Sequence, residues 1–288
     1  MQFLSPPEQI RRYFTSFYLA EITLPPGETV IDHVQPEWAG LRFFSGSLPS
    51  AETPAGAHIA GTRFMATGPS SEAVRFSIGA ARVWGVGLLP LGWAKFLQAD
   101  AARLANVAVD GYAHPAFAGF RPLADTLFGP EPDIAAEYAR IAAHFLARID
   151  KPLADEQRII AVHEALIDPE IVSVAALVER VGVTPRTLER VCARAFGFAP
   201  KLLLRRQRFM RSLAQFMLDP TIRWSGAMDG SYYDQAQFVR DCKQFLGMTP
   251  SQYAALDKPI LAAVMRARAR IAGAAVQTLD GPEGGVAG

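Results

Sequence analysis

Up to about residue 90, the chain alternates short apolar runs with breaks that are rich in proline, glycine and serine. These runs include FYLAEITL, LRFFSG, HIAGTRFMAT, VRFSIG and RVWGVGLL. They are rich in phenylalanine, valine, isoleucine and threonine, and they follow one another roughly every ten residues, which is typical of antiparallel strands in a sandwich or barrel. The pattern therefore predicts that the first domain is mostly β.

Beyond residue 90 the spacing of the apolar positions changes. The segments GWAKFLQADAARLANV and DIAAEYARIAAHFLARI place apolar residues three and four positions apart. This period is that of amphipathic helices. We expect such helices to close a first domain over residues 1–125 and to form a helical connector over residues 126–154.

From Asp155 onward the helical pattern continues almost without a break to about residue 258. Two of the expected helices begin behind a capping residue: Thr184, which precedes Pro185, and Asp234, which occupies the equivalent place fifty residues later. The pattern predicts an all-α second domain over residues 155–258, so the fold class is α+β. The tail, residues 259–288, can form a helix before its Gly-rich end, and the pattern gives it no role.

A fifteen-residue pattern occurs twice in this second domain. The stretch RTLERVCARAFGFAP ends at Pro200, and AQFVRDCKQFLGMTP ends at Pro250. At this fixed offset Leu188 aligns with Phe238, and both stretches keep a cysteine, a glycine and the final proline in register. A repeat at a fixed offset indicates one supersecondary unit that is used twice.

The first copy has the pattern of a helix-turn-helix. In VAALVERVGVTPRTLERVCARAFG a short helix is expected to end at Gly182, and a second helix begins after Thr184. In this motif the second helix enters the major groove, where arginine recognises guanine with two hydrogen bonds. The residues expected on its outward face are Arg186, Thr187, Glu189, Arg190 and Arg194.

Positive charge is concentrated around this second helix, although the whole chain has a formal net charge of only +1. Such a concentration attracts phosphate groups. A helix-turn-helix also occurs in proteins that never touch DNA, so a protein-interaction module remains an alternative. Between residues 186 and 211 only Glu189 opposes the basic residues Arg186, Arg190, Arg194, Lys201, Arg205, Arg206, Arg208 and Arg211.

Residues 155–256 resemble the DNA-binding domain of the AraC/XylS family of bacterial transcription regulators. The resemblance is strongest in YYDQAQFVRDCKQFLGMTPSQY, and it extends to the linker APKLLLRRQRFMRSLAQF and to the G-x-x-P that closes both repeats. It implies two helix-turn-helix units joined by one long helix, with recognition helices that read two successive major grooves. It also implies double-stranded DNA as the partner, a homodimer or an effector as the means of control, and RNA polymerase contact if the protein is an activator.

Carried over by position, this resemblance assigns base-reading roles on both recognition helices. In the first helix they fall on Arg186, Glu189 and Arg190. Glutamine suits adenine, whereas alanine and valine can only pack against a thymine methyl group, so the chemistry favours the first helix. In the second helix the base-reading candidates are Gln235, Ala236, Val239 and Arg240, and Lys243 is a further DNA-binding candidate.

The second unit departs from the family pattern in its first helix. The stretch DPTIRWSGAMDGSYYDQ is short, and Ser231 stands where the turn glycine usually is. Gly226 and Gly230 each weaken a helix by about 1 kcal/mol relative to alanine. We expect this unit to be the more loosely held.

By the same resemblance, the first domain is expected to be cupin-like and to bind an effector or to mediate dimerisation. Its stretch LPPGETVIDHVQPEWAGLRFFSG contains His33, Trp38 and Phe43, which are candidates for a small-molecule pocket. An apolar face of a sandwich also contains such residues simply as core. Both interpretations stay open at this point.

A metal-dependent cupin-like enzyme is the alternative of another class. It would need clustered ligands, typically two histidines one residue apart with a nearby carboxylate. The five histidines here are isolated, and no Ser-His-Asp or Gly-rich phosphate motif is present. We therefore expect no enzyme activity, no metal and no cofactor.

The sequence also indicates where the protein is found. It has two cysteines without metal-ligand spacing, no secretion signal and no apolar run long enough to cross a bilayer. We expect a cytoplasmic protein with no membrane contact.

Overall fold

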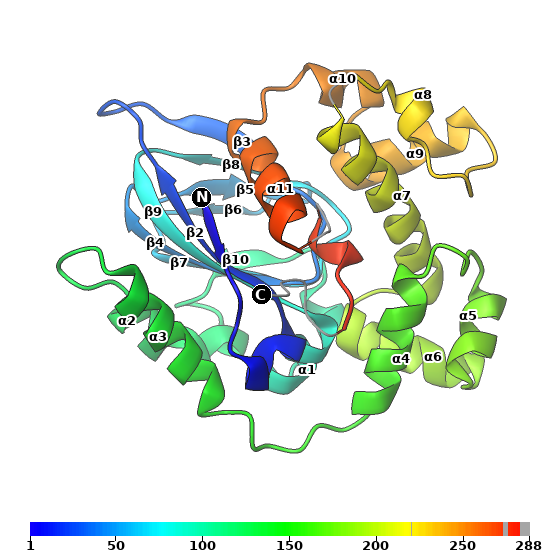
Figure 1. Ribbon diagram of the computed structural model, residues 1–288, viewed down its shortest axis with the longest axis horizontal. Coiled ribbons are helices and arrows are strands. Elements are labelled where there is room, and N and C mark those ends of the chain that lie inside the picture. Colours follow the sequence, from blue (N-terminus) through cyan, green and yellow to red (C-terminus); the bar gives the residue numbers. More distant parts are fainter. Residues whose placement is uncertain (220, 273–275, 283–288) are drawn as a thin grey trace.

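The computed structural model describes residues 1–219, 221–272 and 276–282 (Figure 1). Two antiparallel sheets build the first domain, which confirms the β-rich prediction. One sheet has the strand order β1 (Gln2–Leu4), β2 (Phe14–Ile22), β9 (Ala81–Leu88), β4 (Gly40–Gly46), β7 (Phe64–Thr67) and β10 (Ala108–Asp110). The other has the order β3 (Val30–Val34), β8 (Val74–Ile78), β5 (Ser50–Glu52) and β6 (His58–Ala60).

The six-stranded sheet is buried on both of its faces. Successive residues of a strand point to opposite faces, so each strand contributes to two cores. Phe43 of β4 and Trp84 of β9 belong to a core that includes Phe145 of the covering helices. Their neighbours Phe44 and Val83 belong to a second core, which fills the space toward the four-stranded sheet.

Three helices follow the strands: α1 (Pro90–Phe96), α2 (Arg121–Thr126) and α3 (Ile134–Leu146). The single helix expected over residues 92–107 does not form. The α1 helix ends at Phe96, Gln98 and Asn106 have positive φ angles that a helix does not allow, and β10 then pairs with β7 at the edge of the sheet. Tertiary pairing therefore overrides the helical spacing.

The α3 helix falls in the segment expected to be a connector, yet it is part of the first domain. Its Glu137 is buried and accepts hydrogen bonds from Trp84 Nε1 and Arg82 Nη2, each at 2.6 Å. Phe145, near its end, packs edge-on against Phe14. The link to the second half is consequently the short stretch between α3 and the following helix.

The second half is helical, as predicted. It consists of α4 (Glu156–Ile167), α5 (Val174–Val181), α6 (Pro185–Val191), α7 (Pro200–Leu218), α8 (Trp224–Ala227), α9 (Gln235–Leu246) and α10 (Pro250–Ala255). A five-residue π-helical turn continues α6. The long α7 joins the first unit, α5 and α6, to the second unit, α8 and α9 (Figure 1).

The chain then returns to the first domain as α11 (Pro259–Ala272), which lies beside the strands in Figure 1. A short helical turn, Gln277–Leu279, follows it. The sequence pattern gave this tail no role, and its Gly-rich end, residues 283–288, lies outside the described residues.

The two helix-turn-helix units have different cores. Leu188 and Cys192 of the first unit belong to the same buried core as Phe14 and Trp84 of the first domain. Cys242 of the second unit belongs to a separate core. The first unit is thus packed into the first domain.

Candidate nucleic-acid interface and cavity

The first unit has the turn that its sequence predicts. Ser173 caps α5 by accepting a hydrogen bond from Ala176 N, and α5 ends at Val181, followed by the C-cap residue Gly182, whose φ of +70° favours glycine. Thr184 then caps α6 by accepting from Thr187 N at 3.2 Å. Leu188 is fully buried and holds α6 against the rest of the unit.

The outward face of α6 is on the surface. Arg186, Glu189, Arg190 and Arg194 are exposed, whereas Thr187 is half-buried and its hydroxyl bonds that of Thr184. An exposed helix face that carries three arginines fits the chemistry of guanine edges and phosphates.

Arg190 is engaged by an ion pair within the chain. Its guanidinium donates to Asp155 Oδ2 at 2.7 Å, and Arg158 donates to the other oxygen of the same carboxylate. The hydrogen bonds from Arg190 and Arg158 lower the pKa of Asp155 to about 2. Arg190 must exchange this partner before it can contact a base.

The second recognition helix, α9, begins behind Asp234, which accepts from Gln237 N at 2.6 Å. Tyr233, immediately before the cap, is 93% exposed. The sequence motif did not assign it a role, although an aromatic residue beside a helix cap can be recognised in the sequence. Its ring has no packing role, so it is a further candidate for DNA contact. Of the predicted DNA-binding residues on α9, Val239 is half-buried and the others are exposed, namely Gln235, Ala236, Arg240 and Lys243.

The first helix of the second unit, α8, has only four residues, in agreement with the glycine-rich sequence. Asp229 forms the turn that glycine would otherwise make. Its Oδ1 accepts from the backbone N–H of Ser231 at 3.0 Å and from the Ser231 hydroxyl, and its other oxygen binds Arg211. A carboxylate therefore stabilises a turn that lacks the family's glycine.

The α7 arginines, which the sequence suggested as phosphate ligands, bind acidic and main-chain groups of the protein instead. Arg205 and Arg208 donate to the two oxygens of Asp241, which is only 1% exposed. Arg211 pairs with Asp229, and Arg206 is fully buried. Arg205, Arg208 and Arg211 fix the second unit to α7 and also line a cleft of about 320 Å³ between the two units.

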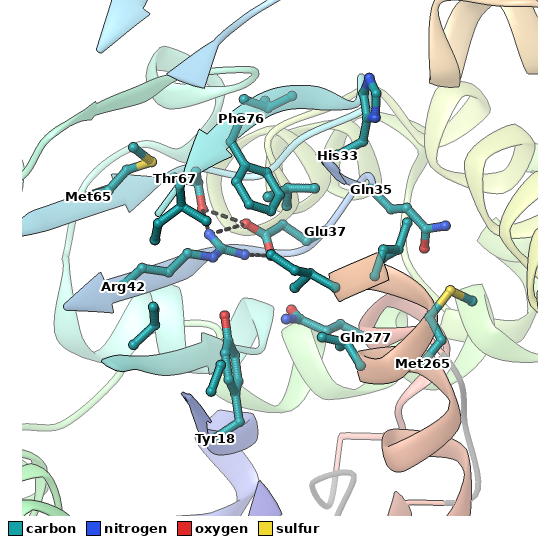
Figure 2. Close-up of a pocket in the computed structure, with 18 of the residues that line it drawn as sticks. Tyr18, His33, Gln35, Glu37, Arg42, Met65, Thr67, Phe76, Met265 and Gln277 are labelled. Carbon is teal, nitrogen blue, oxygen red and sulfur yellow. Dashed lines mark hydrogen bonds and ion pairs between the residues drawn. The ribbon is translucent and has the colours of Figure 1, made fainter. Parts of the chain in front are cut away.

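A second cavity, of about 150 Å³, lies in the first domain between the sheets (Figure 2). Its polar centre is Arg42, which donates to both carboxylate oxygens of Glu37, at 2.9 and 2.7 Å, and to the Thr67 hydroxyl. The Tyr18 ring lies beside this centre because Gly85, on the neighbouring strand, has no Cβ; a Cβ there would come within 1.9 Å of the ring.

Of the three effector candidates, only His33 lines this cavity. Phe43 points to the opposite face of the sheet, where it stacks on Phe64 at 4.8 Å. Trp38 is buried at the contact with the second half. Alternation along β4 determines this outcome, because Arg42 and Phe44 take the cavity side.

Charges in the cavity are balanced. Burial alone would lower the pKa of Arg42, but the adjacent Glu37 carboxylate outweighs it and raises that pKa. Burial lowers the pKa of His33, which favours its neutral form.

In the part of the chain that the structure describes, no three His, Cys, Asp or Glu side chains are grouped to hold a metal ion. Every helix within that part is too short or too polar to cross a membrane.

Comparison with known families decides the nature of the second half. Residues 177–255 match the sequence model of a family described as "Helix-turn-helix domain", a range that runs from α5 to the end of α10 and includes both units. The chain carries an AraC-type helix-turn-helix domain. No curated protein matches the chain in sequence.

Solved structures with a similar arrangement include ToxT from Vibrio cholerae. One ToxT structure is 12% identical, covers 83% of this chain and 96% of its own, and has a TM-score of 0.42. Another, described as bound to an unsaturated fatty acid, is 13% identical, covers 84% and 96%, and has a TM-score of 0.40.

One wall of the cavity is in direct contact with the AraC-type domain. Residues 32–38, here called the docking segment, run from the end of β3 toward β4 and contact α7 and α10 of the second half and the α11 helix that follows it. Asp32 accepts from Ile260 N and Leu261 N of α11, both at 2.8 Å. Gln35 Nε2 donates to the Tyr253 hydroxyl of α10, also at 2.8 Å.

The third contact involves Arg206 of α7. Its guanidinium lies over the Trp38 ring at 4.1 Å and donates to the Ser70 carbonyl oxygen at 2.8 Å. Burial lowers the pKa of Arg206 to about 9. The residues just before Trp38, from His33 to Glu37, line the cavity, so the same short segment touches both the cavity and the AraC-type domain.

Proposed function

We propose that the protein is a sequence-specific DNA-binding transcription regulator of the AraC/XylS type, controlled through its first domain. The observation that carries this proposal is the pair of capped recognition helices. The α6 helix precedes the long α7 in the chain and α9 follows it, and both lie within the matched AraC-type domain. Each of the two helices exposes polar or basic residues. Two such helices in one chain suit two successive major grooves.

In this proposal Arg186 and Arg190 read bases from α6, and Gln235 and Arg240 read them from α9. Arginine pairs with guanine and glutamine with adenine, each through two hydrogen bonds. The salt-bridged arginines of α7 hold the two units at a fixed separation, and the exposed Arg194 and Lys243 contact phosphates. Such phosphate contacts position the protein without selecting sequence.

Control through the first domain is supported by the cavity and the docking segment. A small-molecule effector in the cavity contacts the segment that holds α7, α10 and α11. A ligand shifts such an arrangement only by binding its two states with different affinity. Dimerisation through the first domain is the other means of control that the family resemblance implies.

The test is selection of bound sequences from random DNA by the purified full-length chain. We expect enrichment of two short motifs whose centres are about one helical turn apart. Affinity for the selected site should fall with salt, with a slope of about 0.9 per phosphate contact in a plot of log affinity against log salt. If no sequence is enriched and binding does not respond to salt, the helix-turn-helix is a protein-interaction module and the proposal is wrong.

A further inference from the structure

We propose that the cavity of the first domain binds a neutral, mostly apolar small molecule, and that residues 259–272 and 276–282 form a movable wall of this site. This proposal rests on the proposed function only for its consequence on DNA binding. The wall follows the AraC-type domain in the chain, and only residues 256–258 separate α10 from α11. Movement of the wall is thereby transmitted to the second unit.

The C-terminal segment contributes a large part of the lining. Ile260, Leu261, Val264 and Met265 of α11 face the cavity, together with Gln277 beyond it. The opposite side is formed by the two sheets (Figure 2). The site is therefore complete only while α11 is in place.

Specific polar contacts hold this wall closed. The buried Asp32 carboxylate binds the first N–H groups of α11, which have no partner within the helix. Arg268 is 2% exposed and donates to the Ser16 hydroxyl of β2 at 3.0 Å and to Asp280. Gln207 of α7 binds the main chain of the same segment at Thr278. The wall is thus attached both to the first domain and to the AraC-type domain.

The lining determines the class of ligand. It is mostly apolar, with Phe44, Met65 and Phe76 among its residues. Both arginines of the lining already have a carboxylate, Arg42 with Glu37 and Arg268 with Asp280, so a ligand carboxylate would find no unpaired arginine there. An unpaired charge is strongly disfavoured in such surroundings. The cavity consequently favours an uncharged ligand.

Three polar atoms in the lining lack a partner among the described residues. They are Gln277 Oε1, which is an acceptor, Arg268 Nε, which is a donor, and His33 Nδ1. Figure 2 shows the Gln277 amide pointing toward the cavity centre. A hydroxyl or amide on the ligand satisfies these atoms. At about 150 Å³ the cavity has space for roughly ten water-sized groups, which matches a single-ring or fused two-ring molecule.

The first experiment measures ligand binding to the full-length chain by isothermal calorimetry and thermal shift. The probes are two matched pairs: 4-phenylbutan-1-ol with 4-phenylbutanoate, and 2-naphthol with 2-naphthoate. We expect the neutral member of at least one pair to bind, and its carboxylate to bind at least about tenfold more weakly. Equal or tighter binding of the carboxylates overturns the ligand class. Failure of both neutral probes to bind overturns the site.

Variants then locate the binding. Val264→Trp fills the cavity from α11 and should abolish binding of the neutral probe, whereas Arg266→Trp adds the same bulk on the exposed side of α11 and should leave it unchanged. If Val264→Trp does not fold, Met65→Trp fills the same space from β7. Full binding by a folded cavity-filling variant places the probe elsewhere and overturns the proposal.

The movable wall is tested by hydrogen exchange in residues 259–272. Asp32→Ala removes the oxygen, Oδ2, that accepts from both α11 N–H groups, and exchange there should become at least about tenfold faster, while the neutral probe should slow it in the unchanged protein. If neither the substitution at Asp32 nor the neutral probe changes the exchange rate, the proposal that this wall moves is wrong. Ligand binding and hydrogen exchange are measured without DNA. If the separate DNA selection enriches no sequence, the proposed regulator function fails, but the results on the cavity and its wall still stand.

Discussion

Asp155 and Arg190 form an ion pair that the DNA-binding hypothesis must include. Arg190 keeps 42% of its side-chain surface exposed, and exposed pairs contribute only about 0–1 kcal/mol. The pair therefore orients Arg190 without preventing its transfer to a guanine. Asp155 itself has a positive φ of 59° just before α4, so the main chain fixes the position of its carboxylate.

Replacing Arg190 with alanine should weaken binding to the selected site by about 1–3 kcal/mol and relax the preference at one base position. The measurement is fluorescence anisotropy on the selected site and on single-base variants. Asp155→Ala is the control, since it removes the same ion pair but no DNA contact, and it should keep the affinity within about 1 kcal/mol. Unchanged affinity and preference in Arg190→Ala would remove this residue from the set of readers.

Two buried histidines predict a specific dependence of stability on pH. Burial, with the charge of Arg206 nearby, lowers the pKa of His163 to about 3, and burial lowers that of His144 to about 4. In the unfolded chain both titrate near 6.5. Below that pH the unfolded state binds protons that the folded state does not, so stability is complete above about pH 6.5 and falls as the pH decreases.

Each histidine contributes a slope of up to about 1.4 kcal/mol per pH unit in the free energy of unfolding between pH 6 and 4.5. Urea titrations across this range should show that His163→Gln has a slope smaller by about that amount than the unchanged protein. The comparison uses slopes, because the substitution also changes stability at every pH. Parallel curves would mean that His163 is protonated in the folded state.

At the scale of elements, the sequence predicted the features that depend on local chemistry. The caps at Thr184 and Asp234, the turn at Gly182 and the shortness of α8 all follow from side chains close in sequence. The prediction of a single helix over residues 92–107 was wrong because the pairing of β10 with β7 is a long-range interaction. The cavity was missed for the same reason, since strand register decides which face each residue takes.

The shortness of α8 leads to a prediction about the second unit. Gly226 lies in α8, is exposed and has no positive φ, so alanine should stabilise the helix by up to about 1 kcal/mol. An added Cβ would meet Ile222 Cγ1 at 3.0 Å, and the Ile222 side chain is expected to turn aside. Gly230 lies outside the helix, so Gly230→Ala serves as the control with a smaller effect. The measurement is hydrogen exchange of residues 224–227, and slower exchange only in Gly230→Ala would contradict the argument.

At the scale of the whole molecule, one core joins the first domain to the first helix-turn-helix unit. Arg206 contributes to this union although the sequence suggested a phosphate ligand. A signal was present: Leu203, Arg206, Met210 and Leu213 follow one another at helical spacing, and the other three are fully buried. An arginine within an apolar stripe is therefore expected to be covered, but the stripe does not reveal which partner covers it.

Arg206→Ala should lower the free energy of unfolding by about 2–4 kcal/mol, because it leaves a void beside Trp38 and an unsatisfied carbonyl at Ser70. Urea unfolding followed by circular dichroism measures this loss and should show whether one transition becomes two. Arg194→Ala, at an exposed position of the π-helical turn that continues α6, is the matched control and should change stability by less than about 0.5 kcal/mol. Equal stability of the two variants would show that the contact does not hold the halves together.

The anchoring of α11 on the first strands also sets an order of events during translation. Asp32 is separated from Leu261 by 229 residues, and Ser16 from Arg268 by 252 residues. At about 5–20 residues per second, the ribosome needs roughly ten to fifty seconds to produce the stretch between them. During that interval the two sheets exist without the helix that completes their cavity, so the apolar faces of Phe44 and Phe76 are open to solvent or to a chaperone. The nascent chain therefore has an exposed binding surface that the finished protein covers.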